Sequence, residues 1–232
     1  PKNLKYWENM KTENQLSKIK PADRLASVSE YYFSKKLKEV AQMNAEGKDV
    51  ISLGIGSPDM PPSESTIQTL CDATRNPDGH GYQPYVGIPE LRKAFADWYK
   101  RWYDVELDPA TEIQPLIGSK EGILHISLAF LNPGDGVLVP NPGYPTYTSV
   151  SRLAEARIIP YELREENGWQ PDFEALEKCD LSGVILMWVN YPHMPTGAPA
   201  SRELFEKLVD FGMRHSLSLI HISEPTRRTP IS

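Results

Sequence analysis

Apolar residues in this chain follow two patterns, short solid runs and runs in which they recur every three or four positions. Residues 183–189 form a solid run without polar alternation, which indicates a strand buried on both faces of a parallel sheet. Leu91, Phe95, Trp98 and Trp102 follow the other pattern and predict an amphipathic helix with an aromatic core side. Since the patterns alternate, the sequence predicts an α/β fold with a mostly parallel sheet and helices on both faces.

Turn signals divide the chain into these elements. Proline and glycine clusters separate the apolar runs, and Ser or Asp residues stand where several helices would begin. We expect strands at residues 48–53, 113–117, 137–139, 156–161 and 183–189. We expect an N-terminal helix that ends at Gly47, and helices at residues 63–73, 89–102, 123–131, 146–153, 172–177 and 201–211.

Composition narrows the class of protein. With 40% hydrophobic and 24% charged residues, the 232-residue chain is typical of a soluble globular protein. The net charge of -6 argues against nucleic acid and anionic membranes as partners, and no apolar run approaches membrane-spanning length. The N-terminus has no signal-peptide core, and the two cysteines, Cys71 and Cys179, imply no disulfide framework, so we expect a cytoplasmic location. The five histidines lack metal-site spacing, and we expect no metal site.

The turn at Gly118-Ser119-Lys120 follows a predicted strand and opens an apolar helix. The exposed N–H groups of a first helical turn and the positive end of the helix dipole both favour an anion such as phosphate. Ser119 adds a hydroxyl and Lys120 a positive charge. An ordinary helix N-cap is the structural alternative, and the spacing is not that of a P-loop.

Two further loops follow predicted strands. Residues 141–147 hold Tyr144 between a glycine and a proline, where its ring could stack on a planar ligand. Residues 190–197 contain two prolines, which predict a rigid polar loop; the structural alternative is a plain crossover turn. Ligands of open parallel sheets bind outside the carboxyl ends of the strands, where all three loops would lie.

Together these loops resemble the site of the class I and II aminotransferases, pyridoxal-phosphate enzymes of fold type I. The likeness covers about residues 21–215, and within the family the chain is similar to the LL-diaminopimelate aminotransferases and their relatives. The motifs that carry it occur in the family's order: Leu53-Gly54-Ile55-Gly56, Tyr82-Gln83-Pro84-Tyr85-Val86-Gly87, Gly118-Ser119-Lys120-Glu121, Pro142-Gly143-Tyr144-Pro145 and Pro195-Thr196-Gly197.

The resemblance implies a role for each matching position. Ser119 and Lys120 match the pair that binds the phosphate of pyridoxal 5′-phosphate, and Tyr144 matches the aromatic residue that stacks on its ring. Asn190 and Thr196 belong to the loop expected at the polar edge of that ring. Three further matches complete the expected site: Tyr82, which would reach the phosphate of a neighbouring subunit in a homodimer, and Gly56 and Tyr31 on the substrate side.

The resemblance also implies three segments and an activity. Residues 1–48 would form the N-terminal arm and part of a small domain, residues 49–215 a partial cofactor-binding large domain, and residues 216–232 a tail without family likeness. The implied activity is transfer of an amino group from an amino acid to a 2-oxo acid. Another fold type I chemistry, such as a carbon–sulfur lyase, and a non-catalytic ligand-sensing domain are the alternatives, and the sequence does not identify the amino donor or acceptor.

Three departures from the family's pattern change the expectation. Met194 stands where the family has an asparagine that donates to the ring hydroxyl, and a thioether cannot donate; Asn190 or His193 is the candidate substitute. Ile222 and Pro225 stand where the family has the aspartate and tyrosine that contact the ring. No lysine follows Lys207, so the Schiff-base lysine is absent and we expect no catalytic residue and no transamination from this chain alone.

Overall fold

The computed structural model describes residues 20–27, 32–53 and 60–221. These residues form two compact units, one built from residues 118–221 with the N-terminal 20–27 segment, the other from residues 32–117. Each unit is described by itself below. The three segments expected from the sequence have different boundaries and stay a prediction.

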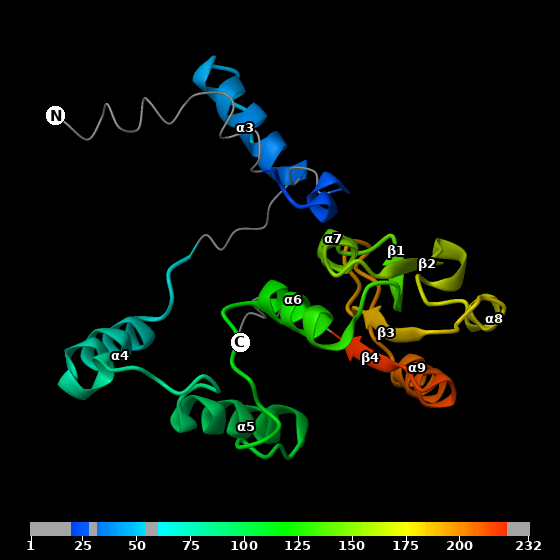
Figure 1. Cartoon of the computed structure of the whole chain (residues 1–232). Coiled ribbons are helices and arrows are strands. Elements are labelled where there is room, and N and C mark those ends of the chain that lie inside the picture. Colours follow the sequence, from blue (N-terminus) through cyan, green and yellow to red (C-terminus); the bar gives the residue numbers. More distant parts are fainter. Residues whose placement is uncertain (1–19, 28–31, 54–59, 222–232) are drawn as a thin grey trace. The chain divides into compact units, whose positions relative to one another are not determined.

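The first unit contains a four-stranded sheet in which every pairing is parallel (Figure 1). The strand order is β2-β1-β3-β4, so the chain crosses over the sheet between strands as an α/β fold requires. The mostly parallel sheet predicted from the apolar runs is therefore confirmed. Its strands are β1 (Gly136–Asn141), β2 (Arg157–Glu162), β3 (Val184–Val189) and β4 (Ser218–His221).

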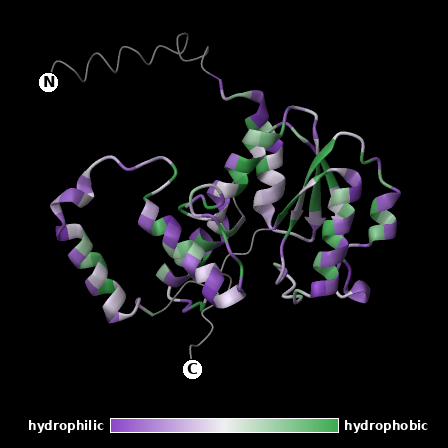
Figure 2. Cartoon of the chain, turned by 90° about the horizontal axis from the view of Figure 1, so that it is seen from below, coloured by the Kyte–Doolittle hydropathy of each residue, from purple (hydrophilic) through white to green (hydrophobic). Residues whose placement is uncertain are grey.

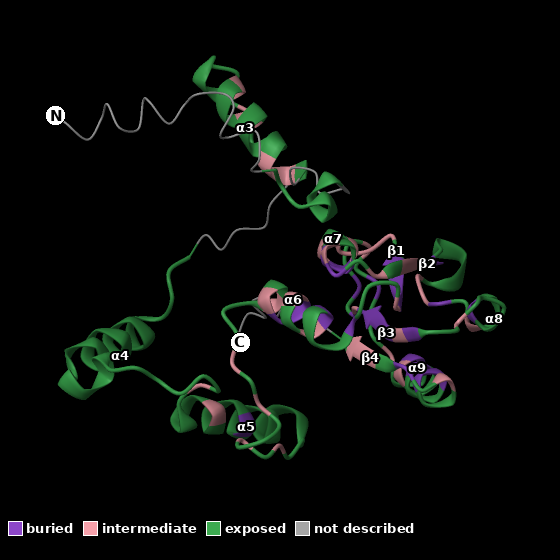
Figure 3. Ribbon diagram, viewed as in Figure 1, coloured by how far each residue is buried: buried purple, intermediate pink, exposed green. Residues whose placement is uncertain are grey.

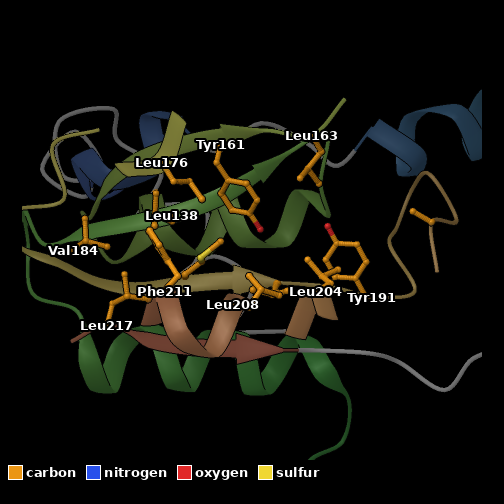
Figure 4. Close-up of a cluster of buried hydrophobic side chains, with 13 residues drawn as sticks. Leu138, Tyr161, Leu163, Leu176, Val184, Tyr191, Leu204, Leu208, Phe211 and Leu217 are labelled. Atoms are coloured by element: carbon orange, nitrogen blue, oxygen red, sulfur yellow. The ribbon is translucent and has the colours of Figure 1, made fainter. Parts of the chain in front are cut away.

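Helices cover both faces of this sheet, as expected. On one face, Val137 and Val139 of β1 pack in a cluster with residues of α6 (Ser119–Phe130) and α7 (Pro145–Leu153). On the other face, Leu138 packs in a cluster with residues of α8 (Phe173–Glu177) and α9 (Arg202–His215). Figure 4 shows the side chains of this second cluster, and Figure 2 shows the apolar colour concentrated along the strands.

Capping residues set where several helices begin. The side chain of Ser201 accepts a hydrogen bond from the Leu204 N–H at 3.1 Å at the start of α9. Asp172 caps α8 by accepting from the Ala175 N–H at 3.0 Å. Both side chains satisfy backbone donors that the first turn of a helix leaves unpaired, so these helix starts were predictable from local sequence.

The second unit is helical in its described part. It contains α3 (Tyr32–Ala45), α4 (Glu64–Arg75), the short 3-10 helix η2 (Pro77–His80) and α5 (Pro89–Tyr103). Figure 3 colours most residues of these helices as exposed and several as intermediate, and Ala96 is the buried residue among them. The expectation that the aromatic side of α5 is core is wrong for the described residues, because Trp98 and Trp102 are 42% and 62% exposed.

The strands expected at residues 48–53 and 113–117 are also wrong, since neither segment pairs with a strand among the described residues. The side chain of Asn44 satisfies both backbone groups of Val50 in place of a neighbouring strand. Pro115 has no N–H to donate, and Ile117 is almost fully exposed. An apolar run becomes a strand only where a partner pairs with it.

The described residues also bear on membrane insertion and on metal binding. No helix there has the length and apolar character needed to cross a bilayer. The same part of the chain holds no group of three or more His, Cys, Asp or Glu side chains placed to hold a metal ion.

Candidate functional site

The candidate site lies at one edge of the sheet. β1 and β3 are parallel neighbours, so the loops that follow Asn141 and Val189 leave the sheet on the same side. Those loops are residues 142–145, here called the tyrosine loop, and residues 190–198, here called the polar corner.

The start of α6 reaches this edge. The Lys120 ammonium lies over the ring of Tyr144, with Nζ 5.7 Å from the ring centroid. Gly118 is the N-cap and offers no side-chain cap, while Ser119 in the first turn is half-buried. The helix dipole, the first-turn N–H groups and the Lys120 charge therefore combine on one side of an aromatic ring, which suits an anionic ligand with a planar ring.

A column of aromatic rings supports Tyr144 from the core. Tyr144 meets Tyr147 edge-on, with ring centroids 5.7 Å apart and planes at 83°. Tyr147 in turn stacks on Trp188 of β3, with centroids 5.1 Å apart and planes at 11°. Tyr147 and Trp188 are both buried, so the half-buried Tyr144 is the end of a rigid column.

The polar corner is closed by its own hydrogen bonds. Asn190 Oδ1 accepts from the backbone N–H of Met194 at 2.8 Å. The Thr196 hydroxyl pairs with His193 Nδ1 at 2.8 Å and accepts from the Ala198 N–H at 3.3 Å. Two backbone bonds complete the corner, from the His193 N–H to the Ala198 carbonyl at 2.8 Å and from the Gly197 N–H to the His193 carbonyl at 2.7 Å.

His193 is the buried polar centre of this corner. Its side chain is 2% exposed, and Nε2 has no hydrogen-bond partner among the described residues. Burial lowers the pKa of His193 below its ordinary value, because the charged form loses its hydration, while the carbonyl of Pro142 in the tyrosine loop acts in the opposite direction. The imidazole is therefore neutral near pH 7.

Hydrogen bonds between residues far apart in the sequence hold Tyr191 of the polar corner and Trp188 of β3. The Tyr191 hydroxyl donates to the Trp169 carbonyl at 2.7 Å, and His221 Nε2 lies 2.8 Å from the Tyr191 carbonyl. The Tyr161 hydroxyl donates to the Trp188 carbonyl at 2.6 Å within the core. Burial raises the pKa of both the Tyr161 and the Tyr191 hydroxyl, so each stays protonated and acts as a donor.

The structure brings most of the expected site residues together. Ser119, Lys120, Tyr144, Asn190 and Thr196 all belong to the first unit and to the loops and helix start at this edge. The remaining three do not join them: Tyr82 is fully exposed in the second unit, and Gly56 and Tyr31 lie outside the described residues.

Sequence reasoning missed the supports of the site. Tyr147 and Trp188 hold Tyr144 from behind, and the only local sign was the three-residue spacing between the two tyrosines, which puts them on one side of a helix start. Met194 takes part through its backbone N–H, and its side chain is 46% exposed. The weakened contact expected at this position stays a prediction.

Two hollows lined by described residues lie elsewhere. One of about 690 Å³ runs between α5 and residues 106–110 in the second unit. Another of about 360 Å³ lies between α3 and residues 50–53. Neither is lined by an expected cofactor residue, so the candidate site rests on its side-chain geometry.

Comparison with known proteins identifies the class. A family model described as aminotransferase class I and II matches residues 48–221, and the chain belongs to this family. Pyridoxal 5′-phosphate is the cofactor of the family. The match includes β4, whose residues the sequence analysis counted with the tail.

Individual relatives narrow the similarity further. The chain is 42% identical over 203 residues to LL-diaminopimelate aminotransferase from Dehalococcoides mccartyi, covering 88% of this chain and 52% of the relative. It is 45% identical over 200 residues to the enzyme of the same name from Oleidesulfovibrio alaskensis, covering 86% and 52%. The structure of alanine aminotransferase from Pyrococcus furiosus matches with a TM-score of 0.79 at 30% identity, covering 87% of this chain and 51% of the other. The chain thus spans about half the length of the relatives it matches.

Proposed function

We propose that this chain provides the phosphate- and ring-binding part of a pyridoxal-phosphate-dependent aminotransferase, an enzyme that moves an amino group from an amino acid to a 2-oxo acid. The observation that carries the proposal is the approach of the Lys120 ammonium to the Tyr144 ring at the start of α6. A protein can recognise this cofactor by its phosphate and by its aromatic ring. The helix start at Lys120 suits the phosphate, and the ring of Tyr144 suits the cofactor ring.

The phosphate end fits the helix start. Ser119 and Lys120 are the first two residues of α6, so the positive end of the dipole and a hydroxyl lie beside a lysine charge. The Glu121 carboxylate of the same turn carries the opposite charge, so the Ser119 hydroxyl, the first-turn N–H groups and the Lys120 charge are the groups that suit a dianion.

The ring end fits less completely. Tyr144 offers a face held in place by Tyr147, which supports stacking of a planar ring. At the polar edge, Asn190 uses its carbonyl oxygen to hold the Met194 N–H, and the Thr196 hydroxyl is engaged with His193. We therefore assign Asn190 and Thr196 chiefly to shaping the corner, with the Asn190 amide as the group that would donate at this edge.

When bound, the cofactor supplies an electron sink for bonds at the amino acid's α-carbon. The residues of this chain bind and orient it: Lys120 and Ser119 hold the phosphate, Tyr144 fixes the ring plane, and the column behind Tyr144 prevents tilting. The proposal includes a homodimer in which Tyr82 contributes to the partner's site and a cytoplasmic location. Gly56 and Tyr31 are kept as proposed substrate-side residues.

Pyridoxamine 5′-phosphate is the sharpest probe, because it has no aldehyde and cannot react with surface lysines. Calorimetric titration of the purified 232-residue chain should show binding, and pyridoxamine without the phosphate should bind at least about 10-fold more weakly. Lys120→Met should weaken binding of the phosphate ester by about 10- to 150-fold, the equivalent of a charge-assisted hydrogen bond worth about 1.5–3 kcal/mol.

Lys178→Met is the matched control, because Lys178 is an exposed lysine at the end of α8. It removes the same charge from the chain and should leave the affinity unchanged. Equal affinity for the phosphorylated and unphosphorylated probes, or equal loss in both lysine variants, would contradict the proposed site.

A further inference from the structure

The two loops at the sheet edge follow different strands, and the polar corner contains a buried histidine, His193, whose Nε2 has no hydrogen-bond partner among the described residues. We infer that His193 is a positioning residue that couples the polar corner to the tyrosine loop, with Nδ1 bound to Thr196 and the Nε2 proton directed at the Pro142 carbonyl. The inference rests on the proposed function, because the coupled loops are the ones assigned to the cofactor ring.

The corner side of the coupling is a short hydrogen-bond chain. Thr196 Oγ1 accepts from the Ala198 N–H at 3.3 Å and lies 2.8 Å from His193 Nδ1. A hydroxyl has one proton to donate, and giving it to Nδ1 completes the chain from Ala198 through Thr196 to the ring. In this arrangement Nδ1 accepts, and the neutral imidazole carries its proton on Nε2.

The other ring nitrogen, Nε2, is buried and has no such bond among the described residues. The Pro142 carbonyl favours the protonated ring, as a hydrogen-bond acceptor does. Because a carbonyl only accepts, an Nε2–H directed at it stabilises the pair, whereas a bare Nε2 would be repelled.

The coupling has a direct effect on the candidate site. Pro142 lies two residues before Tyr144, so fixing the Pro142 carbonyl restricts the backbone that carries the stacking ring. The aromatic column holds Tyr144 from the core, through Tyr147. His193 would hold the same loop from the polar corner, and the ring position would then depend on both supports.

Two substitutions test separately the contact of His193 with Thr196 and its contact with Pro142. His193→Asn keeps a polar group near the position of Nδ1 but is too short to reach Pro142. His193→Gln places its amide near the position of Nε2 but leaves Thr196 without its partner. His125→Gln is the control, because His125 is an exposed histidine of α6 outside both loops.

Amide hydrogen exchange measured by NMR on the cofactor-free chain provides the readout. In His193→Asn, exchange at Tyr147, whose N–H is bonded to the Tyr144 carbonyl, should accelerate by about 3- to 10-fold, the value of one neutral hydrogen bond, while Ala198 stays protected. In His193→Gln the pattern should reverse. A purely local structural role would change only the polar corner in both variants, and that result would overturn the coupling.

The wild-type chain offers a test that needs no variant. Imidazole nitrogen shifts from long-range proton–nitrogen correlation should identify His193 as the Nε2–H tautomer, and a proton on Nδ1 would overturn the inference. Affinity for pyridoxamine 5′-phosphate then connects the coupling to the site: His193→Asn should weaken it by about 3- to 10-fold, and His125→Gln should not. Failure of the wild-type chain to bind the probe refutes the proposed function, whereas the exchange and tautomer results judge the coupling by themselves.

Discussion

Tyr147 connects the core of the sheet to the candidate site, and replacing it tests both. Tyr147→Ala removes the middle ring of the column between Trp188 and Tyr144. Tyr147 is 1% exposed and Trp188 is fully buried, so the deleted ring leaves a cavity that surrounding side chains fill only in part. Truncation of a large buried aromatic side chain costs about 3–5 kcal/mol. Of this, the two ring contacts account for about 0.5–1.5 kcal/mol each.

A loss of this size is large against the 5–15 kcal/mol that typically separates folded and unfolded states. Urea unfolding followed by tryptophan fluorescence should therefore show a clearly lower midpoint for Tyr147→Ala. Tyr147→Phe keeps both ring contacts and loses only the hydroxyl, so it should cost no more than about 1.5 kcal/mol. Phe130→Ala is the control, because this aromatic residue of α6 is 61% exposed. It should change stability by about 0.5 kcal/mol or less.

The same variants report on the site. Tyr147→Leu keeps apolar bulk but removes the edge contact to Tyr144, so affinity for pyridoxamine 5′-phosphate should fall by about 3- to 10-fold. Tyr147→Phe should bind as the unmodified chain does. Tyr147 would not support Tyr144 if Tyr147→Ala were no less stable than Phe130→Ala, or if Tyr147→Leu bound the probe with undiminished affinity.

Two further predictions concern the polar corner. Met194→Asn supplies an amide donor in place of a half-exposed thioether that cannot donate. In a calorimetric titration, affinity for pyridoxamine 5′-phosphate should rise by about 3- to 10-fold. An unchanged affinity would show that this position does not face the ring edge. Burial lowers the pKa of His193 below its ordinary 6.5, so the unfolded chain binds its proton at a higher pH than the folded chain. Stability is then fully present above about pH 6.5 and falls as the pH falls through the folded-state pKa. Urea midpoints between pH 7 and pH 5.5 should fall more steeply for the unmodified chain than for His193→Gln, and equal slopes would rule out this source of pH dependence.

The sequence by itself determined the elements whose cause is local. The solid run at residues 183–189 formed β3, and Asp172 and Ser201 began α8 and α9 as capping residues. It also determined the side of the sheet on which the site lies. Loops that follow parallel strands share an edge whatever the details of packing, so the tyrosine loop and the polar corner could be assigned to one place.

Only the tertiary structure decided which side chains meet there and which apolar runs become strands. Pairing needs a neighbour, and residues 48–53 and 113–117 have none among the described residues, although their composition suits a strand. The stacking of Tyr147 on Trp188 and the bond between Tyr191 and His221 join positions tens of residues apart. No periodicity encodes such contacts, because they depend on how the helices and strands pack and not on the spacing within any one of them.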